Sequence, residues 1–152
     1  MIQDSQDRIE KVVDLKAPVA RVWSALTDHR EFGEWFRVSL DGPFQVGALT
    51  TGRMTFPGCE HMKWESVTEE LVEERLFAFS WPPSAIDPDT EYDVGAKVVV
   101  EFRLQAIYGG TRLTIVESGF LQFPESKRLE VLRSNQEGWN IQAQHIATHV
   151  GG

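Results

Sequence analysis

The chain has 152 residues, with 23 acidic and 15 basic side chains, and this length predicts one domain over residues 1–152. The net charge of −8 disfavours nucleic acid as a partner, because such binding depends on Lys and Arg that neutralise phosphates. No apolar run approaches the ~18 residues of a membrane span, and no signal-peptide pattern opens the chain, so we expect a cytoplasmic protein. Because Cys59 is the only cysteine, an internal disulfide and a cysteine-cluster metal site are excluded.

The acidic excess is concentrated between Glu60 and Asp93. This segment contains ten acidic residues and only two basic ones, Lys63 and Arg75. A solvated surface that keeps the protein soluble is the simpler interpretation. A docking patch for a basic partner is the alternative.

The first part of the chain predicts a strand and two helices. Alternating residues predict a strand over Arg8–Leu15, and apolar residues at helical spacing after Pro18 predict a helix that closes at Thr27-Asp28. A second short helix is expected over Glu31–Phe36. Turn residues then separate short β-rich runs, which predict a meander of antiparallel strands. The six expected strands are Arg37–Leu40, Ala48–Phe56, His61–Glu70, Arg75–Trp81, Val94–Ala106 and Thr111–Ser118.

The last segment predicts a long amphipathic helix over Glu125–Val150. At ~1.5 Å per residue it reaches ~40 Å, so we expect it to lie across the full width of the sheet. Gly138 inside it costs about 1 kcal/mol relative to Ala, so a kink or a close contact is expected there. Steps of three and four residues define its apolar stripe, which consists of Leu129, Leu132, Gln136, Trp139, Ala143, Ile146 and Val150.

Short apolar and turn patterns recur in order along the chain: Ala17-Pro18, Val22–Asp28, Trp35-Phe36, Arg75-Leu76, Phe79–Trp81, Thr111–Thr114, Ser118–Phe120 and Glu137–Trp139. Through these patterns the chain resembles, over nearly its whole length, the SRPBCC superfamily of START and birch-pollen-allergen-like proteins. Within it, the chain is similar to the branch named for the activator of the heat-shock-protein-90 ATPase.

The resemblance implies an α+β helix-grip fold. In this fold a curved seven-stranded antiparallel sheet wraps around the long C-terminal helix, and two short helices follow the first strand. It also implies either a cavity for a small or lipid-like molecule between sheet and helix, or contact with a chaperone. The full co-chaperone carries a further domain before this one, and we expect no room for it ahead of Arg8. Where the branch often has a large aliphatic residue, this chain has Ala143, so a larger cavity is expected beneath that turn.

Three polar residues fall on apolar faces: Lys11, Glu117 and Gln136. If the first and last strands pair so that Val13 faces Ile115, Lys11 lies opposite Glu117 and can form an ion pair. We hypothesise that this pair lies at one mouth of the cavity, with Gln136 nearby as a polar contact for a ligand. An edge salt bridge without function, worth at most about 1 kcal/mol, is the alternative.

The histidines offer little chemistry. His145 and His149 are four residues apart, a spacing that can chelate a metal, but near a helix C-terminus they also complement the helix dipole, which is the interpretation we favour. The sequence contains no nucleophile elbow, zinc helix, P-loop or dinucleotide motif, so no metal and no cofactor is expected.

Aromatic and apolar residues on inward faces are the remaining candidates, and they either fill the core or line a hollow. With the three polar residues, the candidate ligand-binding set is Lys11, Trp23, Leu26, Trp35, Met54, Trp64, Phe77, Phe79, Trp81, Phe102, Ile115, Glu117, Gln136, Trp139 and Ala143.

Three functions follow from these observations. The first is non-catalytic binding of a small apolar or amphipathic molecule between the sheet and the closing helix. The second is a co-chaperone-like interaction in which the acidic span Glu60 to Asp93 contacts a chaperone or another protein. The third is a polyketide cyclase-like or hydrolase-like enzyme that uses Glu117 as general acid or base, which requires burial to raise its pKa.

Overall fold

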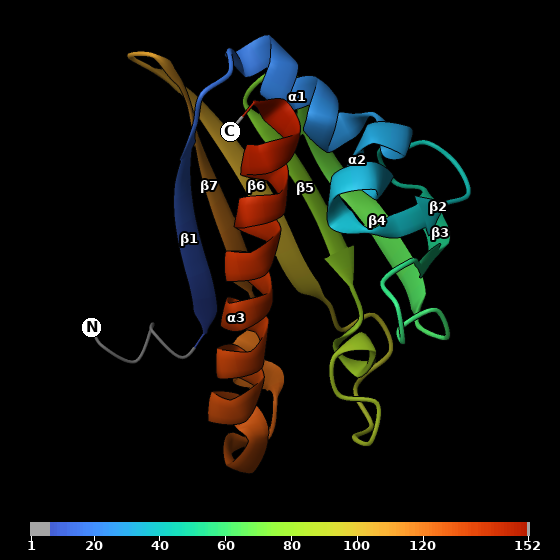
Figure 1. Cartoon of the computed structure of the whole chain (residues 1–152). Helices are drawn as coiled ribbons and strands as arrows, with labels where there is room; N and C mark the ends of the chain where they lie inside the picture. Colours follow the sequence, from blue (N-terminus) through green and yellow to red (C-terminus); the bar gives the residue numbers. More distant parts are fainter. Residues whose placement is uncertain (1–6, 152) are drawn as a thin grey trace.

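The computed structural model describes residues 7–151, which form one antiparallel sheet of seven strands, with a long helix and two short helices packed against it (Figure 1). The strands lie in the order β1-β7-β6-β5-β4-β3-β2. This arrangement confirms the predicted α+β helix-grip fold. In chain order the elements are β1 (Arg8–Leu15), α1 (Val19–Thr27), α2 (His29–Phe36), β2 (Val38–Leu40), β3 (Leu49–Met54), β4 (Lys63–Val72), β5 (Leu76–Trp81), η2 (Pro83–Ala85), β6 (Val98–Ile107), β7 (Gly110–Ser118), η3 (Phe120–Gln122) and α3 (Glu125–Val150).

Most predicted elements differ from the observed ones by only a few residues at their ends. The second helix begins at His29 rather than Glu31, because the Asp28 side chain accepts hydrogen bonds from the Arg30 and Glu31 backbone amides and so caps the helix there. The strand expected from Val94 begins only at Val98, since the turn before it contains Gly95 at a φ of 88°.

The interior between β4, β5, β6 and α2 is filled by aromatic rings. Phe32, Phe77, Phe79 and Phe102 are fully buried and contact one another at ring-centroid distances of 5.5 to 6.4 Å. The indole of Trp35 joins α2 to α1 by donating a 2.8 Å hydrogen bond to the Ala25 carbonyl. Here the inward aromatic residues form solid core.

Helix α3 runs alongside β1, and α1 and α2 lie beside its C-terminal end (Figure 1). The expectation that it crosses the full width of the sheet is therefore wrong. Five of the seven stripe residues are buried, whereas Leu129 and Gln136 are exposed, because the N-terminal half of α3 extends beyond the helices that cover its other end. Of the kink or close contact expected at Gly138, the structure shows no close contact: apart from the backbone of its own helix, a Cβ built there meets no described atom within 4 Å.

The pairing of β1 with β7 corrects the predicted ion pair. Val13 faces Leu113, so Lys11 lies opposite Ile115, and Glu117 lies opposite Ile9. The predicted register was wrong by two residues, a shift that leaves every side chain on the same face and so cannot be detected from alternation.

Two close contacts explain the observed register of β1 and β7. A Cβ at Gly110 would lie 1.9 Å from the Leu15 carbonyl oxygen, so only glycine allows this approach. The Thr111 hydroxyl donates a 2.7 Å hydrogen bond to the Ala17 carbonyl. Both contacts lie where β1 passes into α1, and they hold Leu15 opposite Thr111.

Candidate functional site

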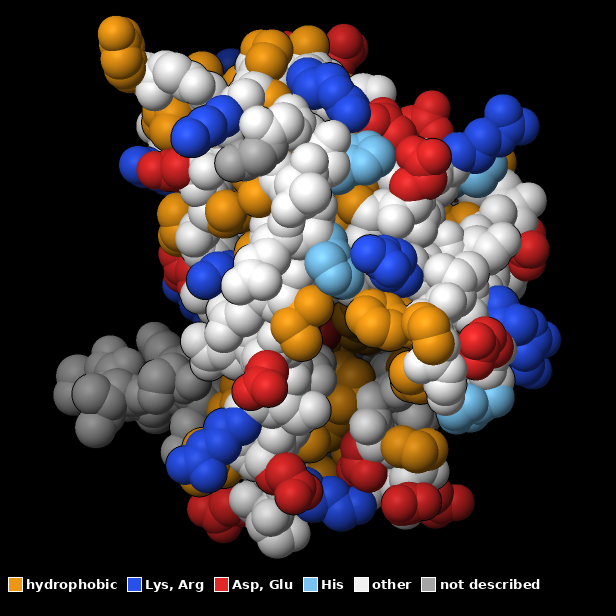
Figure 2. Space-filling view, in the orientation of Figure 1, with side chains coloured by type: hydrophobic (Ala, Val, Ile, Leu, Met, Phe, Trp, Pro, Cys, Tyr) orange, Lys and Arg blue, Asp and Glu red, His pale blue; other side chains and the backbone are white. Residues whose placement is uncertain are grey.

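An open cleft of about 710 Å³ lies between α3, the start of β4 and the end of β5. Figure 2 shows this face hollowed beside α3, with hydrophobic side chains inside the hollow. Its apolar lining consists mainly of Phe36, Met54, Met62, Trp64, Trp81, Ala85, Ile86, Val131, Gly138 and Trp139. Its polar lining consists of Lys63, Glu65, Glu117, Glu130, Ser134, Asn135 and Gln142.

Glu117 is the one fully buried charged residue in this lining. Its Oε1 accepts hydrogen bonds from Trp139 Nε1 at 2.8 Å and from Asn135 Nδ2 at 3.0 Å. Its Oε2 accepts a third from Trp81 Nε1 at 3.2 Å. Burial raises the pKa of the Glu117 carboxyl, and the three hydrogen bonds offset only part of this effect because they stabilise the ionised form.

Three elements bring these groups together. Glu117 is at the end of β7, and Trp81 is at the end of β5, two strands away in the sheet. Asn135 and Trp139 are four residues apart on α3, a spacing that places both on one face of the helix. Trp139 is held there by edge-to-face contact with the Phe102 ring, whose centroid is 5.9 Å away. The carboxyl is thus the point where the sheet and α3 meet.

Three tryptophans line the cleft, and of these Trp81 is half-buried while Trp64 and Trp139 are buried. The Trp64 and Trp81 rings meet edge to face at 5.3 Å, and Trp64 Nε1 donates a 2.9 Å hydrogen bond to the Ser66 hydroxyl. Since the Trp81 and Trp139 N–H groups are bonded to Glu117, all three indole donors have partners within the protein. To a molecule in the cleft these side chains therefore offer ring surface rather than hydrogen-bond donors.

The cleft brings together five of the candidate residues named from the sequence: Met54, Trp64, Trp81, Glu117 and Trp139. The others lie elsewhere. Seven are buried in the core outside the cleft, namely Leu26, Trp35, Phe77, Phe79, Phe102, Ile115 and Ala143. Lys11 is half-buried on β1, Trp23 packs against the core from α1, and Gln136 is exposed.

The sequence interpretation missed the residues that α3 contributes beside Trp139. Asn135, not Gln136, reaches the carboxyl, because a position four residues before Trp139 shares its face more closely than one three residues before it. The four-residue spacing between Asn135 and Trp139 was the feature of the sequence that could have identified Asn135. On α3 the cleft is lined by residues between Glu130 and Gln142, and Ala143, beneath which a larger cavity was expected, is not among them.

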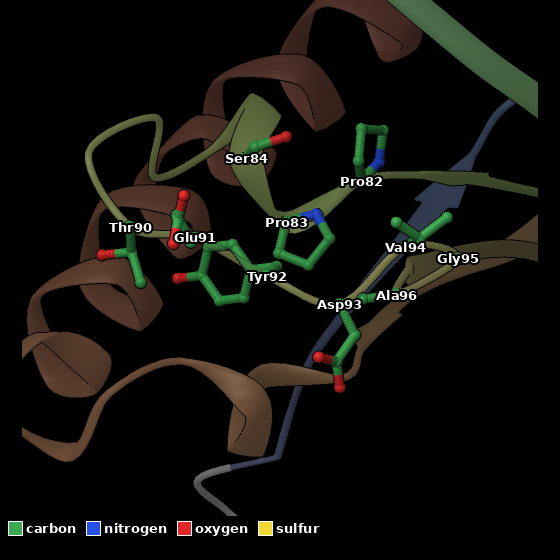
Figure 3. Close-up of a pocket in the computed structure, with 10 residues that line it drawn as sticks. All are labelled: Pro82, Pro83, Ser84, Thr90, Glu91, Tyr92, Asp93, Val94, Gly95 and Ala96. Atoms are coloured by element: carbon green, nitrogen blue, oxygen red, sulfur yellow. The ribbon is translucent and has the colours of Figure 1, made fainter.

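A second hollow, of about 720 Å³, is formed by the segment 82–96 that follows β5 (Figure 3). Its charged lining residues, Glu91 and Asp93, are exposed, and all ten lining residues come from this single stretch of chain. In contrast to the cleft, it offers no buried charged group among its lining residues. The cleft is therefore the stronger candidate site.

The same segment is anchored to α3 through buried Asp87. Lys127 Nζ lies 3.1 Å from Asp87 Oδ1 and 2.7 Å from the Thr90 hydroxyl, and the Tyr92 hydroxyl donates to Asp87 Oδ2 at 2.7 Å. Hydrogen bonds from Thr90 and Tyr92, together with Lys127, lower the pKa of Asp87 to about 2. Burial and the Asp87 carboxylate raise the pKa of Tyr92 to about 12. We call this group the Asp87 anchor.

The two histidines of α3 have different partners. His149 Nε2 lies 2.9 Å from Glu31 Oε2, and Glu31 also bonds to Arg21 and Ser24. His145 lies beside Gln142.

Within residues 7–151, no group of three His, Cys, Asp or Glu side chains could hold a metal ion. Among residues 7–151, every helix is too short or too polar to span a membrane.

A family model described as Activator of Hsp90 ATPase homolog 1-like protein matches residues 16–151. Among solved structures, NE0264 from Nitrosomonas europaea is 18% identical, with a TM-score of 0.74 over 97% of this chain and 96% of that one. CalU16 from Micromonospora echinospora is 21% identical, with a TM-score of 0.67 over 95% and 74% of the two chains.

DynU16, from the dynemicin biosynthetic locus, is 23% identical, with a TM-score of 0.70 over 94% of this chain. This chain spans only 46% of the length of DynU16. At these identities the likeness shows a shared fold. A search of curated proteins finds no match to this chain.

Proposed function

The chain belongs to the family of Activator of Hsp90 ATPase homolog 1-like proteins, and we propose that it binds a small apolar or amphipathic molecule in the cleft without converting it. The observation that carries this proposal is the composition of the cleft. Its volume of about 710 Å³ lies within the range of ~300–1,000 Å³ typical of small-molecule sites. Apolar and aromatic side chains make up most of its wall, and a few polar groups stand between them, which is the usual chemistry of such a site.

A non-catalytic role agrees with the surroundings of Glu117. Its side chain is fully buried, and each oxygen already accepts at least one hydrogen bond from the protein. A general acid or base must come within hydrogen-bond distance of the group it protonates or deprotonates. The enzyme alternative is favoured by one observation, the raised pKa of Glu117, but it requires Trp81 or Trp139 to move aside first.

Contact with a chaperone remains the second candidate, because the family is described by that activity. Two of the ten acids in the acidic span already form ion pairs with lysines, however. Glu69 pairs with Lys97 and accepts from Ser80, and Asp87 belongs to the Asp87 anchor. The acids of the span that are exposed and could meet a basic partner are Glu60, Glu65, Glu70, Glu73, Glu74, Asp89, Glu91 and Asp93.

The proposal is tested by filling the cleft from α3. Leucine at Gly138 would project into the cleft, whereas leucine at Gln136 would lie on the exposed face of the same helix and serves as the matched control. We expect the uncharged dye N-phenyl-1-naphthylamine to bind wild type and Gln136→Leu equally. Its affinity for Gly138→Leu should fall at least tenfold.

Equal dye binding by all three proteins, or none by any, would contradict the cleft as the binding site. Native mass spectrometry of protein from its own host provides an independent measurement. A co-purifying small molecule supports binding, whereas a heavier protein complex supports the chaperone alternative.

A further inference from the structure

Resting on the proposed binding function, we propose that the cleft selects an organic cation with an apolar tail, its cationic group held against the tryptophan rings in front of Glu117. The first supporting observation is charge. Three carboxylic acids, Glu65, Glu117 and Glu130, line the cleft against one base, Lys63. Glu65 on β4 and Glu130 on α3 are both exposed, so each adds to the attraction that a cation experiences near the cleft.

The second observation is the aromatic surface. Trp64, Trp81 and Trp139 come from three different elements and line the same cleft. Their N–H groups are all bonded within the protein, so a ligand meets ring atoms, chiefly those of the half-buried Trp81, because Trp64 and Trp139 are each only 4% exposed. The face of an indole is the best aromatic partner for an ammonium or quaternary ammonium group, because its quadrupole is negative there.

The third observation joins the first two. Trp81 and Trp139 both donate their indole N–H to the Glu117 carboxyl. A carboxylate that accepts from an indole N–H polarises the ring and makes its face more negative, so the cation is attracted by the ring and by the charge behind it. The arrangement does not require the ligand to touch Glu117, which agrees with its complete burial.

Burial raises the pKa of the Glu117 carboxyl, whereas hydrogen bonds from three N–H groups stabilise its ionised form. Three N–H donors are shared by its two oxygens, and no described Lys, Arg or His forms an ion pair with it. A buried charge without a counter-charge is costly, and a bound cation supplies that counter-charge. A bound anion would instead be repelled by the ionised carboxylates of the cleft.

The rest of the lining suits an alkyl or aryl tail. Met54 and Met62 lie on the β3–β4 side, and Ile86 and Val131 close the cleft from the loop after β5 and from α3. Methionine side chains are flexible and adapt to irregular apolar shapes. A molecule with one cationic end and one apolar end therefore matches both parts of the cleft.

The test compares three probes with the same eight-carbon tail: octyltrimethylammonium, octanoate and 1-octanol. Binding to the full-length protein is measured by isothermal titration calorimetry below the concentrations at which the probes form micelles. We expect octyltrimethylammonium to bind at least tenfold more tightly than octanoate, with 1-octanol between them. Glu117→Gln should reduce the advantage of the cation over 1-octanol at least threefold while changing the affinity for 1-octanol less than twofold.

Glu70→Gln is the matched control, since it removes one exposed carboxylate from β4 outside the cleft lining. It should leave all three affinities unchanged. If Glu117→Gln does not fold, the wild-type comparison and the Glu65→Gln/Glu130→Gln double variant, which alters only exposed residues, still test the proposal. That double variant should lower the cation's affinity at least twofold.

The outcomes separate the two proposals. Equal binding of the three probes by wild-type protein, or tighter binding of octanoate, would overturn cation selection and leave the cleft as an apolar site. Failure of every probe to bind would overturn both proposals. An effect of Glu70→Gln as large as that of Glu117→Gln would show that only the overall charge matters, and would also overturn the inference.

Discussion

Trp139 Nε1 lies 2.8 Å from Glu117 Oε1, so the closing helix α3 donates a hydrogen bond to the last strand, β7, inside the protein. Asn135 donates to the same oxygen from one turn earlier, and Trp81 approaches the other oxygen from β5. The carboxyl therefore links α3 to two strands of the sheet. It also forms the base of the cleft, so its contacts bear on both stability and binding.

Trp139→Phe should destabilise the fold by about 1–3 kcal/mol, because it removes one hydrogen bond to the buried Glu117 carboxyl while keeping most of the ring. Urea unfolding measures the change. Trp23→Phe is the control, since Trp23 packs against the core from α1 outside the cleft, and it should cost less than about 1 kcal/mol. Equal losses in the two variants would show that ring size, not the bond to Glu117, matters.

The pKa of Glu117 is raised in the folded protein, and this direction determines how stability depends on pH. Above the ordinary value of 4.5, the unfolded chain loses this proton more readily than the folded chain, so ionisation progressively favours unfolding as pH rises. Glu117→Gln removes this effect. We therefore expect the stability of wild type minus that of the variant to fall between pH 4 and pH 7, measured by urea unfolding at several pH values. A difference that stays flat or rises would contradict the raised pKa.

Gly138→Ala should stabilise the protein by about 0.5–1 kcal/mol, because alanine favours the helix and its Cβ meets no described atom within 4 Å. Gly33→Ala in α2 is the matched control. There the new Cβ would lie 2.3 Å from the Val38 carbonyl oxygen, so the same change should destabilise the fold. Thermal unfolding distinguishes the two signs, and a destabilising Gly138→Ala would show that the cleft is closed at this point.

Lys127→Met should loosen the segment 82–96 without unfolding the sheet, because it removes the cation of the Asp87 anchor. Hydrogen–deuterium exchange should become faster across this segment. Lys97→Met, which breaks the more exposed pair with Glu69, is the control and should leave exchange there unchanged. Unaltered exchange in Lys127→Met would mean that Thr90 and Tyr92 hold Asp87 unaided.

Acid should release the same anchor. The pKa of Asp87 is lowered to about 2, so its stabilising contribution is complete above the ordinary value of 3.8 and is lost as pH falls towards 2. Exchange across 82–96 should therefore be similar at pH 6 and pH 4 once corrected for its intrinsic pH dependence. It should rise near pH 2, and a rise already complete at pH 4 would contradict the lowered pKa.

The local pattern of apolar and polar residues was sufficient to predict most of the helices and strands. Alternation located β1 at Arg8–Leu15, and steps of three and four residues located α3 at Glu125–Val150, because burial on one face imposes these periods on any sequence. It also identified Glu117 as a polar residue on an inward face. The pattern did not reveal the register between β1 and β7. The predicted pairing of Lys11 with Glu117 and the observed pairing of Lys11 with Ile115 place the same side chains on the same face of the sheet.

By itself, then, the sequence determined the order of strands and helices, the faces they bury and the family to which the chain belongs. Only the tertiary structure decided that Phe77, Phe79 and Phe102 are enclosed in the core while Trp64, Trp81 and Trp139, at the edge of that core, line a cleft. Both groups are aromatic and face inward, so their patterns are alike. The difference arises because rings from α2 and from neighbouring strands enclose these phenylalanines, whereas α3 has no side chain at Gly138, where the cleft opens.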